Sequence, residues 1–364
     1  MAPATTPEQI RANLAEIPRI RWSHIPTPLE EWKSLRSRIG GPRLLAKRDD
    51  TTGLAYGGNK SRHFEFEMAH VRNQGFDTLI CVNNFHSNHA RVAAAGCVKA
   101  GIRYILVSVG ETERPIQGNL LLVKLMGGEI HRLPAGEDSS ACAEAIASRV
   151  RAGGGNPYIL NDDWFPQIIG TIGFVEAGLE LMTQLAAYGI ERIHVWGLVG
   201  ASLPGLALLA KNLGLDWKAT MVLYSPGDVG AVRAGMVDRG RKAAEFMKLP
   251  RSLDPEDVEI VDGFSGPAYA APTEAAFEAI HLVARTEAVI LDPNYTGKSM
   301  SALIDRVRSG GFPEDRTVLF LHSGGLPQVF AFNEELAAWR GPDEEWGRLS
   351  GNEAGRRGSG GGSR

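Results

Sequence analysis

The stretch "GLAYGGNKSRHFEF" (53–66) places Lys60 directly after Gly57, Gly58 and Asn59, at the start of a helix-like pattern. A surface lysine requires no such setting. Glycine is used where the backbone takes a conformation, or makes a close approach, that a side chain would prevent. The stretch therefore suggests that Lys60 meets a bulky planar partner at close range. A lone lysine is most often a surface residue, so this interpretation depends on the rest of the chain.

The composition is that of a globular protein with enough length for two domains. The chain has 364 residues, 43% of them hydrophobic and 22% charged. A net charge of -3 and a pI near 6.3 disfavour nucleic acid as a partner. The N-terminal residues lack a signal-peptide pattern, and no run approaches the roughly 18 apolar residues that span a membrane. Cys81, Cys97 and Cys142 have neither disulfide nor metal spacing, so a cytoplasmic location is expected.

Short β-branched runs alternate with helical patterns along the chain, which predicts an α/β fold with mostly parallel sheets covered on both sides. The predicted strands are 43–49, 77–83, 103–109, 129–133, 192–199, 220–225, 288–292 and 317–323. The clearest predicted helices are 89–100, 173–189 and 297–310. The tail 348–364 has almost no large apolar residue and is expected to be disordered.

Loops rich in small and polar residues follow four of the predicted strands. They read "NFHSNHAR" (84–91), "GASLPG" (200–205), "PNYTGKSM" (293–300) and "GGLPQ" (324–328). Ligands of open α/β sheets bind beyond the carboxyl ends of the strands, and backbone N–H groups at strand-to-helix turns favour phosphate. The combination of the four loops predicts a ligand site there.

Each loop also has an ordinary structural interpretation. Ser87 by itself is the typical N-cap of a helix. The glycines of 200–205 are not followed by the Lys-Ser/Thr of a nucleotide-binding P-loop. His86 and His89 have no third ligand at convincing spacing, so no metal is expected.

Several segments resemble the family of D-cysteine desulfhydrases and 1-aminocyclopropane-1-carboxylate (ACC) deaminases. The family comprises pyridoxal-phosphate enzymes of the tryptophan-synthase-β fold, fold type II. The resemblance covers about residues 25–332. It is carried by "PTPLEEWKSLRSRIGGPRLLAKRDDTTGLAYGGNKSR" (26–62), "SNHAR" (87–91), "AYAAPTEAAFEAIHLVARTEAVILDPNYTGKSM" (268–300) and "FLHSGGLPQVFAF" (320–332).

The resemblance implies pyridoxal 5'-phosphate as cofactor and assigns roles around it. Lys60 would form the Schiff base and later act as the base at the substrate α-carbon, with Gly57 and Gly58 letting the backbone lie close to the pyridine ring. Asn88 would bond the phenolic oxygen of the cofactor, and Ser87 would sit near the substrate carboxylate or act as an acid–base group. The phosphate cradle would comprise Val199, Gly200, Ala201, Ser202 and Leu203.

Tyr269 and Tyr295 lie where the deaminases carry two active-site tyrosines. Thr296 stands where the ring-opening deaminases carry a glutamate against the pyridine nitrogen. A threonine there would only hydrogen-bond this nitrogen, giving a weaker electron sink that suits β-elimination. An N-cap role of Thr296 fits both reactions.

Two stretches depart from the family pattern. Residues 83–88 read "NNFHSN" where the family has small residues and a glutamine, and residues 158–174 carry Asp162, Asp163 and Trp164 in place of a small, polar stretch. Both fall where the family shapes its substrate pocket. The predicted pocket residues are His86, His89, Asp162, Asp163, Trp164, His322 and Ser323. An acidic rim would disfavour a second anionic group on the substrate, although Asp162 and Asp163 equally fit a solvated helix cap.

These observations predict a two-domain enzyme with a small domain (64–171) inserted into a large one (1–63 and 172–340). The expected reaction is deamination of a small amino acid by β-elimination, giving a keto acid and ammonia, in a homodimer. The alternatives are β-replacement or another lyase reaction on a hydroxylated or amino-substituted amino acid, ring-opening deamination, and amino-acid binding without catalysis. The amino acid and its configuration stay open.

Overall fold

The computed structural model describes residues 2–110, 112–160 and 164–341 and contains two sheets. The larger sheet has the strand order β1-β2-β10-β7-β8-β9, and only the β1–β2 pair is antiparallel. Its strands are β1 (Leu29–Glu31), β2 (Leu44–Lys47), β7 (Ile193–Leu198), β8 (Trp217–Val222), β9 (Glu259–Val261) and β10 (Thr317–Leu321). The smaller sheet is parallel, in the order β5-β4-β3-β6. Its strands are β3 (Thr78–Asn84), β4 (Arg103–Val109), β5 (Glu129–Leu133) and β6 (Pro157–Ile159).

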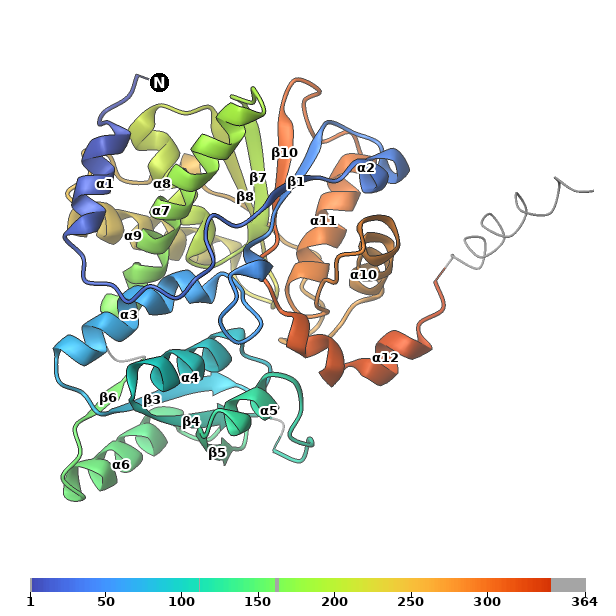
Figure 1. The fold of residues 1–364 in the computed structure, drawn as a ribbon. Coiled ribbons are helices and arrows are strands. Elements are labelled where there is room, and N and C mark those ends of the chain that lie inside the picture. Colours follow the sequence, from blue (N-terminus) through green and yellow to red (C-terminus); the bar gives the residue numbers. More distant parts are fainter. Residues whose placement is uncertain (1, 111, 161–163, 342–364) are drawn as a thin grey trace, which may run out of the picture. The chain divides into compact units, whose positions relative to one another are not determined.

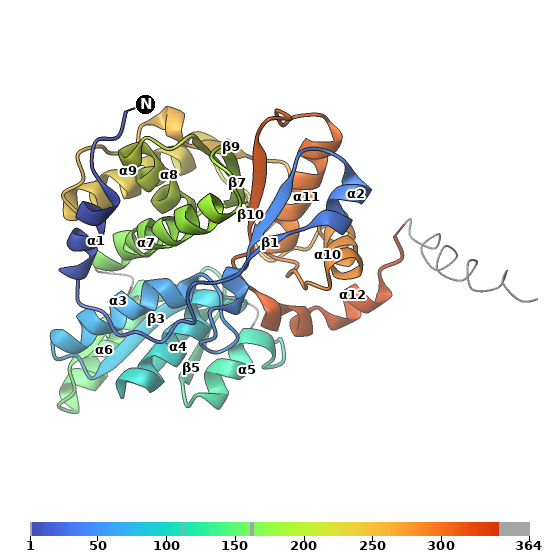
Figure 2. The same cartoon turned by 45° about the horizontal axis from the view of Figure 1, so that its top comes forward.

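Helices cover both faces of the larger sheet (Figures 1 and 2). One face packs against α7 (Phe165–Ala187), α8 (Ser202–Leu213) and α9 (Val229–Phe246), with α1 (Pro7–Ala15) outside α7. The other face carries α2 (Lys33–Ile39), α10 (Glu274–Glu287) and α11 (Thr296–Arg308). The central strands β7 and β10 are buried along nearly their whole length, so the sheet is the centre of a three-layer core.

The smaller sheet is covered in the same way. Leu79 and Cys81 of β3 face α3 (Lys60–Asn73), α4 (Asn88–Ala100) and α5 (Gly118–Leu125), whereas Ile80 between them faces α6 (Ser139–Ala152). Alternate side chains of a strand point to opposite faces, so this run of apolar residues requires helices on both sides.

Three short 3₁₀ segments complete the described part of the larger compact unit, residues 1–331: Asp49–Thr51, Pro255–Asp257 and Leu326–Ala331. A second unit, residues 332–364, contains α12 (Asn333–Ala338) within its described part.

The structure contains most of the predicted elements. The prediction of a strand at 288–292 is wrong. Ala288 ends α10 with a left-handed φ of 55°, and the residues after it form no ladder. Val289 and Leu291 are buried, so the apolar pattern reflects packing and not strand pairing. Strand β8 begins three residues before its predicted start, and the short strands β1, β6 and β9 were not predicted.

The predicted domain boundaries, 63/64 and 171/172, fall inside α3 and α7, two helices that pack against each other. The two-domain division stays a prediction. Helix α7 is the one helix in the described ranges that is long and apolar enough to cross a membrane, and most of its apolar window is buried in the protein. The predicted disordered tail lies outside the described residues.

Candidate active site

A cavity of about 170 Å³ lies where the loop before α3, the start of α4 and the loops beyond β7, β8 and β10 meet. This is the place that the parallel sheet topology favours for a ligand. The lining comprises Asn59, Lys60, Asn83, Ser87, Asn88, His89, Leu198, Val199, Gly200, Ser202, Leu203, Tyr224, Tyr295, Leu321 and Ser323. Ten of the predicted site residues therefore line one cavity.

Lys60 is the first residue of α3, and the two glycines before it have positive φ, 66° for Gly57 and 110° for Gly58. A Cβ on Gly57 would stand 2.1 Å from the carbonyl oxygen of Asp50, and one on Gly58 would stand 3.1 Å from that of Ser323. The glycines thus let this loop pack on the backbone that follows β2 and β10, a reason that the sequence did not reveal. This packing fixes where α3, and Lys60 with it, begins.

Replacing Gly57 by alanine is expected to lower the free energy of unfolding by at least about 2 kcal/mol, because the new methyl group adds a clash to the strain of a positive φ. Gly75→Ala is the matched control, since Gly75 has φ 76° but open space around its Cβ. Urea denaturation of both variants tests this. Equal losses would show that the contact with Asp50 has no energetic weight.

The Lys60 amine is buried, and burial together with the nearby Arg239 guanidinium lowers its pKa to about 8. A neutral amine is both a nucleophile toward carbonyl groups and a base, and an ordinary surface lysine is neutral only at much higher pH. The site therefore holds its lysine in a chemically useful state.

Ser87 and Asn88 open α4 on the opposite wall. Ser87 is the N-cap, as its ordinary interpretation suggests: its Oγ accepts from Ala90 N at 3.1 Å and donates to Asn83 Oδ1 at 2.9 Å. The amide oxygen of Asn88 accepts from Asn119 at 2.9 Å. This contact orients the side chain and leaves the Asn88 NH₂ group as the donor toward a ligand.

Tyr224 and Tyr295 line the third wall, and Tyr269, which is outside the described lining, contacts Tyr295. The hydroxyls of Tyr269 and Tyr295 are 2.5 Å apart, and the Tyr224 ring contacts that of Tyr295 edge-on with centroids 4.9 Å apart. Burial is the main cause that raises the pKa of Tyr295 well above its usual value, and the neighbouring tyrosines add to the effect. The Tyr295 hydroxyl therefore stays protonated and can donate a hydrogen bond. Sequence reasoning missed Tyr224, which ends an apolar run and carries no motif.

Thr296 is fully buried and does not line the cavity. Its hydroxyl donates to Asp292 Oδ1 at 2.7 Å and accepts from Asp292 N at 2.9 Å. The Asp292 carboxylate also receives the backbone N–H groups of Asn294, Tyr295 and Thr296. The hydroxyl proton of Thr296 is therefore used within the turn that Asp292 forms. The N-cap of α11 is Tyr295 and not Thr296.

Three predicted pocket residues lie away from the cavity lining. His86 is buried beside Arg114, and His322 is buried with its Nδ1 near Gly324 N. Trp164 is half exposed and packs against Phe246 of α9. The prediction that Trp164 shapes this pocket is therefore wrong. Asp162 and Asp163 lie outside the described residues.

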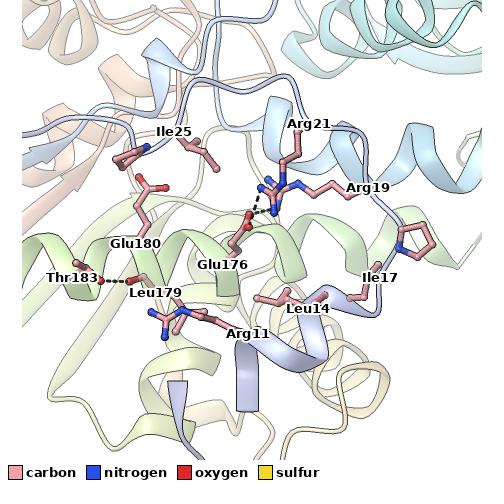
Figure 3. A pocket seen from close by; sticks show the side chains of 13 residues that line it. Arg11, Leu14, Ile17, Arg19, Arg21, Ile25, Glu176, Leu179, Glu180 and Thr183 are labelled. Atoms are coloured by element: carbon pink, nitrogen blue, oxygen red, sulfur yellow. Dashed lines mark hydrogen bonds and ion pairs between the residues drawn. The ribbon is translucent and has the colours of Figure 1, made fainter. Parts of the chain in front are cut away.

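A larger cavity of about 750 Å³ lies between α1, α7 and the segment before β1. Figure 3 shows Arg19 and Arg21 pointing toward Glu176, with Arg21 3.6 Å from that carboxylate. Its charged groups already have partners: Arg19 and Arg21 pair with Glu176, Arg11 with Glu8, and Glu180 with Lys47 and Arg62. Its described lining contains no lysine. Its size alone therefore does not make it the candidate active site.

The sequence of this chain matches the family model of pyridoxal-phosphate dependent enzymes over residues 21–324. The chain belongs to this family. The enzyme is 35% identical over 323 residues to an ACC deaminase of Allorhizobium ampelinum, covering 84% of this chain and 93% of that protein. It is 33% identical over 336 residues to an ACC deaminase of Burkholderia ambifaria, covering 88% and 98%.

Solved structures support the same fold. The crystal structure of an ACC deaminase homologue superposes with a TM-score of 0.81 at 31% identity and covers 92% of the enzyme and 99% of that chain. A pyridoxal 5'-phosphate-dependent aspartate racemase superposes with a TM-score of 0.61 at 16% identity, which shows the fold alone. The predicted fold type II and the predicted cofactor are thereby confirmed.

The residues present fit pyridoxal phosphate. Gly200 has φ 144° and open space at its Cβ position, and α8 begins two residues later at Ser202. Free backbone N–H groups at the first turn of this helix favour a phosphate. Lys60 supplies the amine that the aldehyde of the cofactor requires.

Proposed function

We propose that the enzyme deaminates a small amino acid by β-elimination, as D-cysteine desulfhydrases do, giving a keto acid and ammonia. The bound cofactor supplies electron withdrawal from the substrate α-carbon, which makes the α-hydrogen acidic. Lys60 Nζ takes this proton, a role supported by its burial in the cavity and by a pKa lowered to about 8 by burial and Arg239. The β-substituent then leaves with the bonding electrons, and water hydrolyses the released enamine to the keto acid and ammonia.

The other walls of the cavity hold the reactants in place. The NH₂ group of Asn88 is positioned by Asn119 to donate to the phenolic oxygen of the cofactor. Ser87 caps the start of α4, and backbone N–H groups of the first turn of this helix suit the substrate carboxylate. The linked hydroxyls of Tyr269 and Tyr295 supply a proton to the leaving group.

The observation that carries elimination over ring opening is the absence of Asp and Glu from the described cavity lining. A carboxylate against the pyridine nitrogen keeps it protonated and deepens the electron sink. Asp292, four residues before Thr296, is instead fully buried and accepts from three backbone N–H groups and the Thr296 hydroxyl. Loss of a β-substituent discharges the α-carbanion at once, so it needs no deep sink.

Ring-opening ACC deamination is the second candidate. It is favoured by the paired hydroxyls of Tyr269 and Tyr295 and by the relatives named ACC deaminase. ACC carries no hydrogen on its α-carbon, so ring opening does not begin with the α-proton transfer proposed for elimination. In both reactions Lys60 would hold the cofactor through its amine.

A substrate panel distinguishes the candidates. Purified enzyme is incubated with ACC and with D- and L-amino acids that carry a hydroxyl, thiol or chloride at the β-carbon, and keto acid and ammonia are measured. We expect release from one enantiomer of the β-substituted set and none from ACC. Turnover of ACC alone would establish ring opening. If addition of a thiol makes the enzyme form a new amino acid instead of keto acid, the reaction is β-replacement. If the absorption spectrum shifts but no product forms, the enzyme only binds the amino acid.

The hydroxyl of Tyr295, linked to that of Tyr269, is the proposed proton donor to the leaving group. Tyr295→Phe is expected to lower kcat about 10²-fold with little change in KM, because the proton donor is lost while the ring remains. Tyr188→Phe is the control, since its hydroxyl bonds Leu29 O at 3.1 Å outside the cavity. An unchanged kcat in Tyr295→Phe would remove Tyr295 from the reaction.

Homodimerisation, a cytoplasmic location and the two-domain division stay predictions.

A further inference from the structure

Lys60 lines the cavity, and two further basic side chains, His63 and Arg239, contact α7 at Gly170 and Gln167, about one helical turn apart. None of the three has a carboxylate partner in a salt bridge among the described residues. Lys60 and His63 lie one turn apart on α3, and Arg239 projects from α9. Burial is the main cause that lowers the pKa of Lys60, and Arg239 adds to it. Burial also lowers the pKa of His63, with smaller contributions from Lys60, His89 and Arg239. Asp238, next to Arg239, is paired with Arg241 and Lys242. Buried like charges are costly unless an anion joins them.

His63 lies against the start of α8. A Cβ built on Gly170 of α7 would stand 2.8 Å from His63 Cε1 and 2.7 Å from Ala201 Cβ, so the imidazole and the N-cap of α8 flank the same point. The His63 side chain belongs to a residue that is only 6% exposed. Its Nε2 atom is buried and has no hydrogen-bond partner in the described structure. An orphaned ring nitrogen this deep indicates a missing partner.

Arg239 shows the same deficit. One terminal nitrogen donates to the backbone oxygen of Gln167, whereas Nε is buried without a partner in the described part of the chain. Burial lowers the pKa of this guanidinium, and Tyr224 and Asp238 only partly offset the effect. Of its electrostatic neighbours, Lys60 and Tyr224 line the cavity, and Gln167, which it contacts, lies about one turn of α7 before Gly170.

The loop before α8 offers few side-chain donors of its own. Residues 199–203 contain one hydroxyl, Ser202, and its Oγ already accepts from Asn59 Nδ2 at 2.9 Å. A phosphate bound at this helix start would therefore be held mainly by backbone N–H groups. Its charge would need cations from elsewhere in the fold.

We propose that His63 and Arg239 complete the phosphate subsite of the cofactor together with the first turn of α8. A phosphate dianion neutralises the cluster and accepts hydrogen bonds from the two orphaned nitrogens, His63 in its protonated form. The affinity of this enzyme for the phosphate group thus resides in an imidazole and a guanidinium contributed by α3 and α9. Neither residue was among those predicted from the sequence.

The test compares pyridoxal 5'-phosphate with pyridoxal, which lacks the phosphate. The Kd of each for cofactor-depleted enzyme is measured from the visible absorption, in wild type, His63→Asn and Arg239→Gln. We expect the phosphate form to bind at least about tenfold more weakly in each variant, the loss of one charge-assisted hydrogen bond, and pyridoxal to bind as before. Arg241→Gln and His131→Asn are the controls, because these side chains lie on the surface in pairs with acidic residues.

Conservative variants separate charge from structure. His63→Lys and Arg239→Lys are expected to recover most of the preference for the phosphate form. An unchanged preference in His63→Asn and Arg239→Gln would overturn the proposal, as would equal weakening of both ligands. A raised KM for the amino acid in Arg239→Gln with an unchanged cofactor preference would also overturn it, and would assign Arg239 to the substrate.

Thermal unfolding gives a readout that is independent of turnover. Cofactor binding raises the Tm of a protein that binds it only when folded. This rise is expected to shrink in His63→Asn and Arg239→Gln and to persist in the two controls. A full rise in both variants contradicts the proposal.

Discussion

Replacement of Lys60 by alanine is expected to lower kcat by at least about 10³-fold, because it removes both the covalent attachment of the cofactor and the base at the α-carbon. The variant is also expected to lose the visible absorption band of the covalently bound cofactor. Lys60→Arg keeps the positive charge but should fail in the same way, since a guanidinium does neither task.

Lys298 provides a matched control for this experiment. It is another buried lysine, with a pKa lowered to about 8 by burial, but its Nζ donates to the backbone oxygens of Tyr224 and Ser265 and it does not line the cavity. Lys298→Met is expected to keep the absorption band. An absorption band that survives in Lys60→Ala would show that another amine carries the cofactor.

The lowered pKa of Lys60 also has a consequence for the cofactor-free protein. Because the amine has a pKa of about 8 when folded and 10.5 as its ordinary value, the unfolded chain holds more protons between these limits, and stability rises with pH in that window. Lys60→Met should therefore be more stable than wild type below pH 8. The difference should shrink as pH rises toward 10.5, and denaturation at several pH values checks this sign.

Replacement of Arg62 by methionine is expected to cost about 3–5 kcal/mol of unfolding free energy, the cost of leaving a buried charge without its partner. Arg62 is fully buried and bonds Asp49 through Nε at 2.9 Å and through Nη2 at 3.0 Å. Glu180 of α7 accepts from the same guanidinium at 3.0 Å and also pairs with Lys47. Burial would raise the pKa of Asp49, but the arginine outweighs this effect and keeps it low.

Arg103→Met is the control, because the side chains of Arg103 and Glu129 are about half exposed and such pairs contribute little. We expect it to cost less than about 1 kcal/mol. Both variants are compared by chemical denaturation. An equal loss of unfolding free energy in the two variants would mean that the buried network around Arg62 stabilises the protein no more than the exposed pair does.

The Arg62 variant should also weaken cofactor binding. Arg62 lies two residues after Lys60, and its partner Asp49 accepts the backbone N–H of Gly58 with its own carbonyl oxygen at 3.1 Å. The network therefore joins the first turn of α3 to the loop that positions the lysine. Intact cofactor affinity in a destabilised variant would separate these two effects.

The fold class and the cofactor could be predicted from the sequence, and both are confirmed, whereas the role of Lys60 stays a prediction. Strand–helix alternation predicts the layered fold because the hydrophobic periods of strands and helices are visible in short stretches of sequence. The family resemblance depends on the order of the motifs around Lys60, Asn88 and Tyr295. The apolar run at 288–292 misled because burial and strand pairing leave the same pattern, and only the left-handed Ala288 distinguishes them.

The surroundings of the cofactor site depend on the tertiary fold. Tyr224, His63 and Arg239 carry no motif, since their positions depend on how α3, α7, α8 and α9 pack and not on neighbours in the chain. Two further contacts depend on the tertiary fold. The Thr296 hydroxyl bonds Asp292, and the Trp164 ring packs against Phe246. Contacts between residues far apart in sequence are set by packing, and a pattern of neighbouring residues in the sequence does not predict them.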